Sequence, residues 1–370
     1  MTKKIAFIRK TLVPLASVKL QQALQDQFPE YKVNLIDITE IIKARKDILI
    51  LNALYTFLEY GIPIIRRKKK FKACFFRTKY IFYKIKKLMA NYLADEDYVF
   101  SVQMQSLYDA SKPGLPHFIY TDHTHLANYD YPEVDQSKLY PKWVNLEQKI
   151  YANATLVFTR SQNITRSVVN QYNCSPEKVI CVYAGSNVEV KKIPDDKDYT
   201  NKHILFIGKD WQRKGGPDLL EAYKIVLKTH PTAQLTIVGC SPDVDIPNCN
   251  IIGRIPLEQV NAYFEEASVY CMPTKLEPFG IVFLEALSYK LPIVATNIGA
   301  IPDFIYNNKN GYLVSPGDVD ELAQALIKLL DSPEKCKEFG QEGYKIVNRL
   351  YTWDNTGSLM KKHILSTLNK

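Results

Sequence analysis

The sequence predicts an α/β protein with two doubly wound domains, and three observations support this. The chain has 370 residues, where one domain usually has about 100 to 200. Its second half alternates short apolar runs with amphipathic helical patterns. A polar, non-periodic segment separates the two halves. The composition, with 46% hydrophobic and 24% charged residues, is that of an ordinary globular protein.

The second half alternates strands and helices in a regular series. Each apolar run has the length of a strand, and glycine or proline stands at most of the turns. Such a series favours a parallel sheet with helices on both faces. The predicted strands are 203–208, 234–239, 250–255, 269–273, 292–296 and 311–314, and the predicted helices are 219–230, 257–267, 280–289 and 319–330.

The first half has the same pattern with less regularity. A strand-free interval spans about residues 47–93, and a helix is predicted over 140–152. The predicted strands are 4–8, 32–38, 97–103, 117–121, 155–159 and 178–183.

These elements predict four parts of the chain: an N-terminal domain over 1–190, a linker over 191–201, a C-terminal domain over 202–350, and a helix over 351–370 that packs back towards the N-terminal domain. Two doubly wound domains place a cleft between the carboxyl ends of their sheets, which suits an enzyme with two substrates.

Cysteine usage and apolar runs indicate a cytoplasmic protein. The seven cysteines include no Cys-x-x-Cys pair, which favours reduced core thiols over disulfides or a zinc site. The apolar run near the N-terminus is too short for a signal peptide. No run of about 18 uninterrupted apolar residues predicts a membrane-spanning helix.

The positive charge is concentrated in one stretch. Residues 1–190 hold 27 Lys and Arg against 17 Asp and Glu, and residues 66–87 hold eleven basic residues and no acidic one.

We interpret 66–93 as a basic amphipathic insertion in which one helix over 71–89 packs its apolar face on the domain. Lysines alternate with aromatic residues on the opposite face, which suits an anionic membrane surface. The predicted membrane contacts are Lys72, Phe76, Lys79, Tyr80, Tyr83 and Lys87. A solvated face is the alternative, and nucleic-acid binding is not predicted because no nucleic-acid module surrounds the stretch.

The densest group of candidate functional residues lies at 273–287. A strand runs into a turn with Pro and Gly and then into a helix, so the amides of Gly280, Ile281 and Val282 are expected to be free donors that suit a diphosphate. Glu277 precedes the helix, and Glu285 lies about one and a half turns into it. The alternative is that both glutamates only favour a helix N-terminus.

A second group follows the strand 203–208. Gly208, Lys209, Arg213 and Lys214 stand at the carboxyl end of this strand and before a helix, where they suit phosphate charge. A solvated turn is the alternative. A third, weaker strand-to-helix turn contains Gly299 and Asp303.

Together these motifs resemble the retaining GT-B glycosyltransferases of family 4. The resemblance covers residues 204–330: Glu277 and Glu285 with Phe279-Gly280 between them, Arg213-Lys214-Gly215 upstream, and residues 299–303 and 310–317 downstream. It implies the GT-B fold, with two Rossmann-like domains facing across a cleft. It further implies that Lys214 binds the donor diphosphate, that Glu285 binds the ribose, and that Glu277 and the amides of residues 279–282 bind the transferred sugar and phosphates. Lys209 stands where the family usually has an arginine.

The N-terminal half resembles the family more loosely. Asp122 and His123 stand in reversed order where the family often has a His-Asp-like pair, so either residue could act on the donor sugar or the acceptor. His123 and His125 also suit a metal, but no further ligands accompany them, and no metal or cofactor is expected. The glycine-rich loop of many relatives is replaced by residues 9–14.

The resemblance implies transfer of a sugar, with retention, from a nucleotide-sugar donor to a hydroxyl acceptor. A lipid-linked acceptor or a growing glycan would agree with a protein held on the cytoplasmic membrane face. Positive groups near the leaving diphosphate would stabilise charge that develops as the bond breaks, so no metal is required. The alternatives are a non-catalytic relative that binds a nucleotide sugar or a membrane, and an epimerase or phosphorylase of the same fold.

Overall fold

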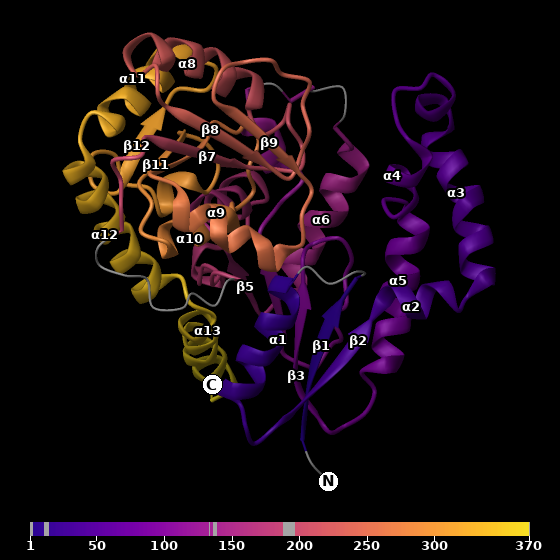
Figure 1. Ribbon diagram of the computed structural model, residues 1–370. Helices are drawn as coiled ribbons and strands as arrows, with labels where there is room; N and C mark the ends of the chain where they lie inside the picture. Colours follow the sequence, from indigo (N-terminus) through magenta and orange to yellow (C-terminus); the bar gives the residue numbers. More distant parts are fainter. Residues whose placement is uncertain (1–2, 11–14, 133, 136–138, 188–196, 370) are drawn as a thin grey trace. The chain divides into compact units, whose positions relative to one another are not determined.

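The computed structural model describes residues 3–10, 15–132, 134–135, 139–187 and 197–369 (Figure 1). Its chain forms two compact units. The N-terminal unit comprises Met1–Asp130, Val134–Ala184 and Thr356–Lys370, and the C-terminal unit comprises Tyr131–Glu133 and Gly185–Asn355. Each unit contains one six-stranded sheet.

The sheet of the N-terminal unit has the strand order β2-β1-β3-β4-β5-β6, with all neighbours parallel. All six predicted strands of this half are present, and 117–121 has the predicted bounds. The strands are β1 (Lys4–Arg9), β2 (Lys32–Asp37), β3 (Tyr98–Met104), β4 (His117–Thr121), β5 (Leu156–Thr159) and β6 (Val179–Cys181).

Helices cover both faces of this sheet, because the strands are apolar on both sides. Ala6 and Ile8 pack in one cluster with Ile81 and Ile85, while Phe100 meets Phe28 on the other face. The helices are α1 (Leu15–Gln27), α2 (Ile38–Lys43), α3 (Lys46–Ile65), α4 (Phe71–Phe75), α5 (Lys79–Tyr92), η1 (Leu126–Asp130), α6 (Pro141–Asn153), α7 (Gln162–Arg166), η3 (Ser167–Gln171) and η4 (Pro176–Lys178).

The sheet of the C-terminal unit has the order β12-β11-β10-β7-β8-β9, again parallel. The predicted strands are all present, and the helix α12 is an addition that the sequence analysis missed. The elements are β7 (His203–Ile207), α8 (Gly216–Thr229), β8 (Gln234–Val238), β9 (Cys249–Gly253), η5 (Leu257–Gln259), α9 (Val260–Glu266), β10 (Val269–Met272), α10 (Ile281–Ser288), β11 (Ile293–Thr296), η6 (Ile301–Asp303), β12 (Gly311–Val314), α11 (Val319–Leu330), α12 (Pro333–Leu350) and α13 (Trp353–Leu368).

The basic insertion is not the single helix predicted over 71–89. The helix breaks between α4 and α5, where the Thr78 side chain caps α5 by accepting from the Ile81 amide at 3.1 Å. The apolar face was predicted correctly, since Cys74, Phe82 and Met89 are buried. Helix α3 precedes the insertion, and it is the one described helix long and apolar enough to cross a membrane by length and composition.

The predicted membrane contacts divide accordingly. Lys72, Lys79, Tyr83 and Lys87 are exposed. Phe76 and Tyr80 are half-buried instead: Phe76 lies under the Lys10 ammonium group, 3.5 Å from its ring centre, and Tyr80 stacks on Tyr55 at 4.7 Å. Both rings therefore contact other side chains of the N-terminal unit.

The chain enters the C-terminal unit for the short segment Tyr131–Glu133, and it passes between the units again after Ala184 and after Asn355. Residues 191–196 of the predicted linker, and residues 11–14 of the loop after β1, lie outside the described residues. Most of α13 belongs to the N-terminal unit, where the Lys361 ammonium group donates to the Gln27 carbonyl at 2.5 Å.

Candidate functional site

Lys214 and Glu277 form an ion pair in the C-terminal unit. They follow β7 and β10, which are neighbours in the sheet, so the two loops leave the same edge. Both side chains are largely buried. The sequence analysis predicted both residues as functional, and the structure brings their charged groups into direct contact.

The two loops are tied together by their backbones. The Arg213 carbonyl accepts from the Lys275 amide at 2.9 Å and from the Thr274 hydroxyl at 3.2 Å. The Arg213 guanidinium donates to the Leu276 carbonyl at 2.8 Å. Gly215, with φ 74°, lets the chain approach so closely that a Cβ atom there would lie 1.8 Å from the Pro273 oxygen. The position of Lys214 beside Glu277 is therefore fixed by the backbone.

The start of α10 provides free donors beside this pair. Gly280 stands before the helix with φ 92°, a conformation that favours glycine. The amides of Gly280, Ile281 and Val282 donate to no group among the described residues. Ile281 and Val282 are half-buried, so these donors can reach a ligand. Unpaired amides at the start of a helix suit an anion.

Glu285 lies in the same helix and is only 8% exposed. Burial raises the pKa of its carboxyl group from 4.5 to about 7. The carboxyl groups of Glu277 and Glu285 both act electrostatically on the buried Tyr270 hydroxyl, which places the two glutamates around one ring. A buried carboxyl group without a charged partner is typical of a functional position.

The other predicted donor-site residues have different surroundings. Gly208 lies against the Lys214 side chain, and Lys209 is exposed to solvent. The Phe279 ring is buried against Phe304, so only its backbone is near the free amides. At the third turn, Gly299 lies against the hydroxyl group of Tyr131, which donates to the Glu277 carbonyl at 2.8 Å.

In the N-terminal unit, Asp122 and His123 face different partners. The Asp122 carboxylate pairs with the Arg160 guanidinium at 3.0 Å. The His123 ring lies 2.9 Å from the Asn128 amide nitrogen, and burial lowers the pKa of the ring, which favours neutral imidazole. His123 lines a cavity, whereas Asp122 does not line it.

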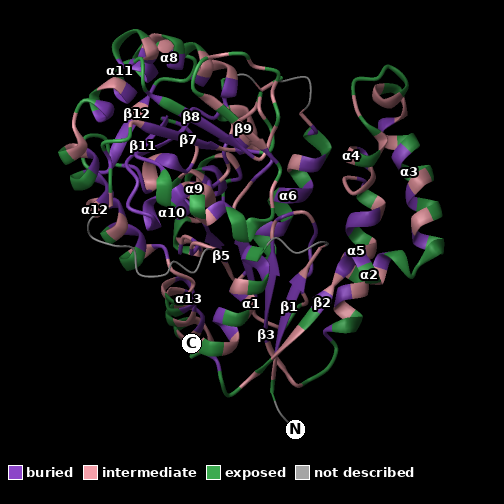
Figure 2. Ribbon diagram, viewed as in Figure 1, coloured by how far each residue is buried: buried purple, intermediate pink, exposed green. Residues whose placement is uncertain are grey.

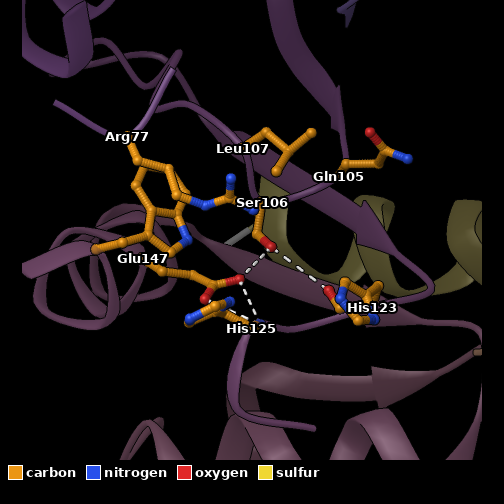
Figure 3. A pocket seen from close by; sticks show the side chains of 8 residues that line it. Arg77, Gln105, Ser106, Leu107, His123, His125 and Glu147 are labelled. Atoms are coloured by element: carbon orange, nitrogen blue, oxygen red, sulfur yellow. Dashed lines mark hydrogen bonds between the residues drawn. The ribbon is translucent and has the colours of Figure 1, made fainter. Parts of the chain in front are cut away.

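That cavity has a volume of about 70 Å³ and lies where the chain leaves β3 and β4 (Figure 3). Glu147 forms one wall and accepts from the Ser106 hydroxyl at 2.7 Å and from the His125 amide at 3.1 Å. Burial raises the pKa of the Glu147 carboxyl group. The lining residues are Arg77, Gln105, Ser106, Leu107, His123, His125, Trp143 and Glu147.

Arg77 brings a positive charge from the basic insertion to this cavity. Its guanidinium lies 4.7 Å from the Tyr140 ring centre, and its Nε atom is buried with no hydrogen-bond partner among the described residues. Gln105, at the end of β3, has φ 64°, a strained conformation for a residue other than glycine. An unpaired donor and local strain at a cavity are typical of a binding site.

The sequence analysis missed Arg77, Gln105, Glu147 and Tyr131. One signal was available: Glu147 stands in the buried stripe of α6 with Trp143 and Ile150, where a charge is unusual. Arg77 gave no signal because it is one of eleven basic residues in its stretch.

No group of three or more His, Cys, Asp or Glu side chains that could hold a metal occurs in the described part of the chain. His125 uses its Nε2 atom to accept from the Tyr140 amide at 3.1 Å, and burial lowers the pKa of its ring to about 4.

Comparison with known proteins finds a family model that matches the segment with the Lys214–Glu277 pair. Residues 188–346 match the family model described as "Glycosyl transferases group 1". The matched segment contains every predicted donor-site residue, from Gly208 to Glu285.

Two curated relatives resemble part of the chain. An uncharacterized glycosyltransferase of Haemophilus influenzae is 31% identical over 36% of this chain and 41% of its own length. A GDP-mannose-dependent monoacylated alpha-(1-6)-phosphatidylinositol monomannoside mannosyltransferase of Corynebacterium glutamicum is 29% identical over 46% of this chain and 52% of its own length. The matches thus span about half the length of these relatives.

A solved structure resembles the whole chain. Sucrose-phosphate synthase from Thermosynechococcus elongatus superimposes with a TM-score of 0.68 at 16% identity and covers 98% of both chains. Two parallel six-stranded sheets with helices and this likeness show the GT-B fold that the sequence predicts.

Proposed function

We propose that the protein is a retaining glycosyltransferase that moves a sugar from a nucleotide-sugar donor to a hydroxyl acceptor. The observation that supports this most is the Lys214–Glu277 pair, because it lies beside three free amides in the segment that matches the group 1 glycosyltransferase model. Glu285 accepts from the ribose hydroxyls of the donor. A non-catalytic relative is less well supported, since the matching family model and the named relatives are described as glycosyltransferases.

The donor site acts by stabilising the leaving diphosphate. Negative charge grows on the diphosphate as the glycosidic bond breaks and the sugar becomes oxocarbenium-like. The Lys214 ammonium group and the amides of Gly280, Ile281 and Val282 are positioned before the reaction, so their stabilisation increases towards the transition state. Glu277 holds the Lys214 ammonium group and binds sugar hydroxyls. Arg213 holds the loop after β10 through its bond to the Leu276 carbonyl. The exposed Lys209 side chain contributes positive charge to the donor site.

The acceptor binds in the N-terminal unit at the cavity beside His123. A phosphate oxygen of the donor accepts the proton of the attacking hydroxyl, while the neutral His123 ring hydrogen-bonds the donor sugar or the acceptor. Asp122 positions this loop through Arg160. Arg77 makes the cavity positive, which suits an acceptor with an anionic group near its hydroxyl.

The reaction needs no metal, since Lys214 and the amides supply the positive field that a cation would otherwise provide. The site of action is the cytoplasm, with the protein bound to the anionic cytoplasmic face of the membrane. This placement is supported by the basic insertion, and a lipid-linked acceptor or a growing glycan fits it.

The first test is a thermal-shift screen with UDP, GDP, ADP and their sugar conjugates. We expect one nucleotide to raise Tm in the wild type and in Glu258→Ala, which removes an exposed carboxylate of the same domain. The shift should disappear in Glu285→Ala. If no nucleotide stabilises the wild type at millimolar concentration, the proposed donor site is wrong.

A second test addresses the reaction. The cognate donor is incubated with candidate glycolipid and glycan acceptors in EDTA, and the product is examined by proton NMR. The proposal requires product formation in EDTA with the anomeric configuration of the donor. An inverted product would contradict retention, and a product that forms only with added metal would contradict the metal-free reaction.

A further inference from the structure

Helix α3 has its polar residues turned towards the protein. The buried stripe of this 20-residue helix contains Ile48, Asn52, Thr56 and Tyr60, which recur every four residues. Three of these four side chains are polar. A helix on the surface of a water-soluble domain normally buries its apolar stripe and exposes polar residues. Helix α3 has the opposite arrangement.

The outward face of α3 is apolar along the length of the helix. Leu58 is 69% exposed, Ile62 is 67% exposed and Ile65 is 78% exposed. Exposed segments recur along α3 in Figure 2. We call this surface the α3 outer face; its members are Ile50, Leu51, Leu54, Tyr55, Phe57, Leu58, Ile62 and Ile65.

Hydrogen bonds hold the polar stripe on the protein. The side-chain amide of Asn52 makes two hydrogen bonds: its nitrogen donates to the Phe75 carbonyl at 2.6 Å, and its oxygen accepts from the Thr78 hydroxyl. The Tyr60 hydroxyl donates to the Arg77 carbonyl at 2.9 Å. These bonds tie α3 to α4 and to the start of α5, beside which α3 runs in Figure 1. The outward position of the leucines and isoleucines is thereby fixed.

Basic residues border the α3 outer face at both ends. Lys43, Arg45 and Lys46 lie at its start, and a basic run over 66–70 follows its end. The two acidic residues of the helix are engaged, since Asp47 pairs with Arg45 at 2.7 Å and Glu59 accepts from the Lys79 amide at 3.0 Å. The charged border is therefore positive.

We propose that α3 lies in the plane of an anionic bilayer, with its outer face inserted among the lipids and its basic ends at the phosphate groups. An apolar face with positive ends matches the boundary between acyl chains and anionic headgroups. Because α4 and α5 cover the other side of α3, the helix lies in the interface and does not span the bilayer. A symmetric dimer through this face would bring like charges together, which argues against a second copy as the occupant.

This inference refines the membrane contact in the proposed function and moves its main element from α5 to α3. Lysines of α5 would then attract the membrane, while the α3 outer face would provide insertion. The donor site is in the other unit, so nucleotide binding can be measured separately from membrane binding.

The test is flotation of the full chain with phosphatidylcholine vesicles that contain or lack phosphatidylglycerol. We expect wild type to bind the anionic vesicles, and Leu54→Glu/Leu58→Glu to bind them at least tenfold more weakly. Leu257→Glu is the matched control, because Leu257 is 54% exposed but lies in the C-terminal unit, and it should bind like wild type. Equal urea-unfolding midpoints of the three proteins would show that they remain folded.

Two results would overturn the inference. One is equal binding of the double variant and wild type to anionic vesicles. The other is a wild-type dimer in vesicle-free light scattering that becomes monomeric in the double variant, with no vesicle binding by either protein. A missing nucleotide shift in wild type that still binds vesicles would instead contradict the proposed donor site.

The depth of α3 is tested with Leu58→Trp and lipids brominated at different positions. We expect the added fluorescence to be quenched most by bromine near the headgroup end of the acyl chain. Strongest quenching by bromine near the chain terminus would contradict the in-plane orientation.

Discussion

The Lys214–Glu277 pair and Glu285 represent two kinds of buried charge in one domain. Lys214 and Glu277 neutralise each other through direct contact. Glu285 is buried with a pKa of about 7. Removing one member of a buried pair leaves an uncompensated charge, which is costly, whereas neutralising a lone buried carboxyl group is not. The two glutamates should therefore respond differently to substitution.

Lys214→Ala should lower kcat by about 10² to 10³-fold, because it removes a positive group that acts on the developing diphosphate charge. Lys224→Ala is the control, since Lys224 is exposed on α8 and pairs only with Glu221. Steady-state kinetics with saturating donor would measure the difference. Equal kcat values for the two variants would show that Lys214 does not act in the transition state.

Glu285→Gln should stabilise the free protein at alkaline pH. The folded-state pKa of Glu285 is raised above its ordinary 4.5 to about 7, so the native state holds a proton that the unfolded state has lost. The free energy of unfolding thus decreases as pH rises from 4.5 to 7, by roughly 3 kcal/mol in total. Glutamine does not ionise and avoids this loss. The Tm of the variant should increasingly exceed the Tm of wild type as the pH rises from 5 to 8, and nucleotide should no longer raise the Tm of the variant. Parallel curves of Tm against pH for the two proteins would contradict the burial of an ionisable carboxyl group at this position.

Arg77→Gln should raise KM for the acceptor and leave nucleotide binding unchanged. The Arg77 guanidinium is at the cavity beside His123, while the donor residues belong to the other unit. Acceptor titration at fixed donor would measure KM, and a thermal shift with nucleotide would check the donor site. A variant with normal KM for the acceptor would remove Arg77 from the binding site.

Among single residues, sequence patterns predicted those that belong to a local motif. Glu277, Gly280 and Glu285 lie within nine positions on one strand-turn-helix unit, so spacing was sufficient to find them. Arg77 and Gln105 come from different elements that only the folded chain brings together. The pairing of Asp122 with Arg160 could not be predicted from local spacing either, because the two residues are 38 positions apart in the sequence.

Among the elements, strands were predicted best. Strands β4 and β12 have the predicted bounds, because each is a short apolar run with proline or glycine at its start. Helix α3 was missed because the polar residues of its stripe, Asn52, Thr56 and Tyr60, are too few to stand out in a mostly apolar run. The break after α4 was missed because the helical period continues through it, although Thr78 is a typical capping residue.

Thr78→Ala should destabilise the N-terminal unit by about 1 to 2 kcal/mol. The substitution removes the cap of α5. It also leaves the side-chain oxygen of Asn52, Oδ1, without the Thr78 hydroxyl donor. Thr367→Ala is the control, because Thr367 lies near the end of α13 and bonds only the His363 carbonyl of its own helix. Urea unfolding would compare them, and equal midpoints would show that the cap is not needed.

The two units of the molecule differ in how many segments of the chain they contain. The C-terminal unit uses almost one continuous segment, Gly185–Asn355, while the N-terminal unit is completed by residues from Thr356 onward. Gly357 lets α13 approach α1, since a Cβ atom there would lie 3.3 Å from the Ala23 Cβ atom. The last helix is thus part of the first domain's packing.

Met360→Ala should destabilise the N-terminal unit by about 2 to 5 kcal/mol, because Met360 is fully buried and the substitution leaves a cavity. Calorimetry with and without the bound nucleotide would separate the units: the nucleotide-sensitive transition should keep its temperature. A shift of that transition alone would show that α13 supports the C-terminal unit instead.

The split of the N-terminal unit sets an order of events during synthesis on the ribosome. Residues 185–355 form one continuous segment, so most of the C-terminal unit can fold without any later part of the chain. The first 184 residues, although made earlier, lack the helix that packs beside α1 until residues 353–368 have also been made. We therefore expect the second domain to reach its native state first, and the nascent first domain to be the one that needs protection from chaperones.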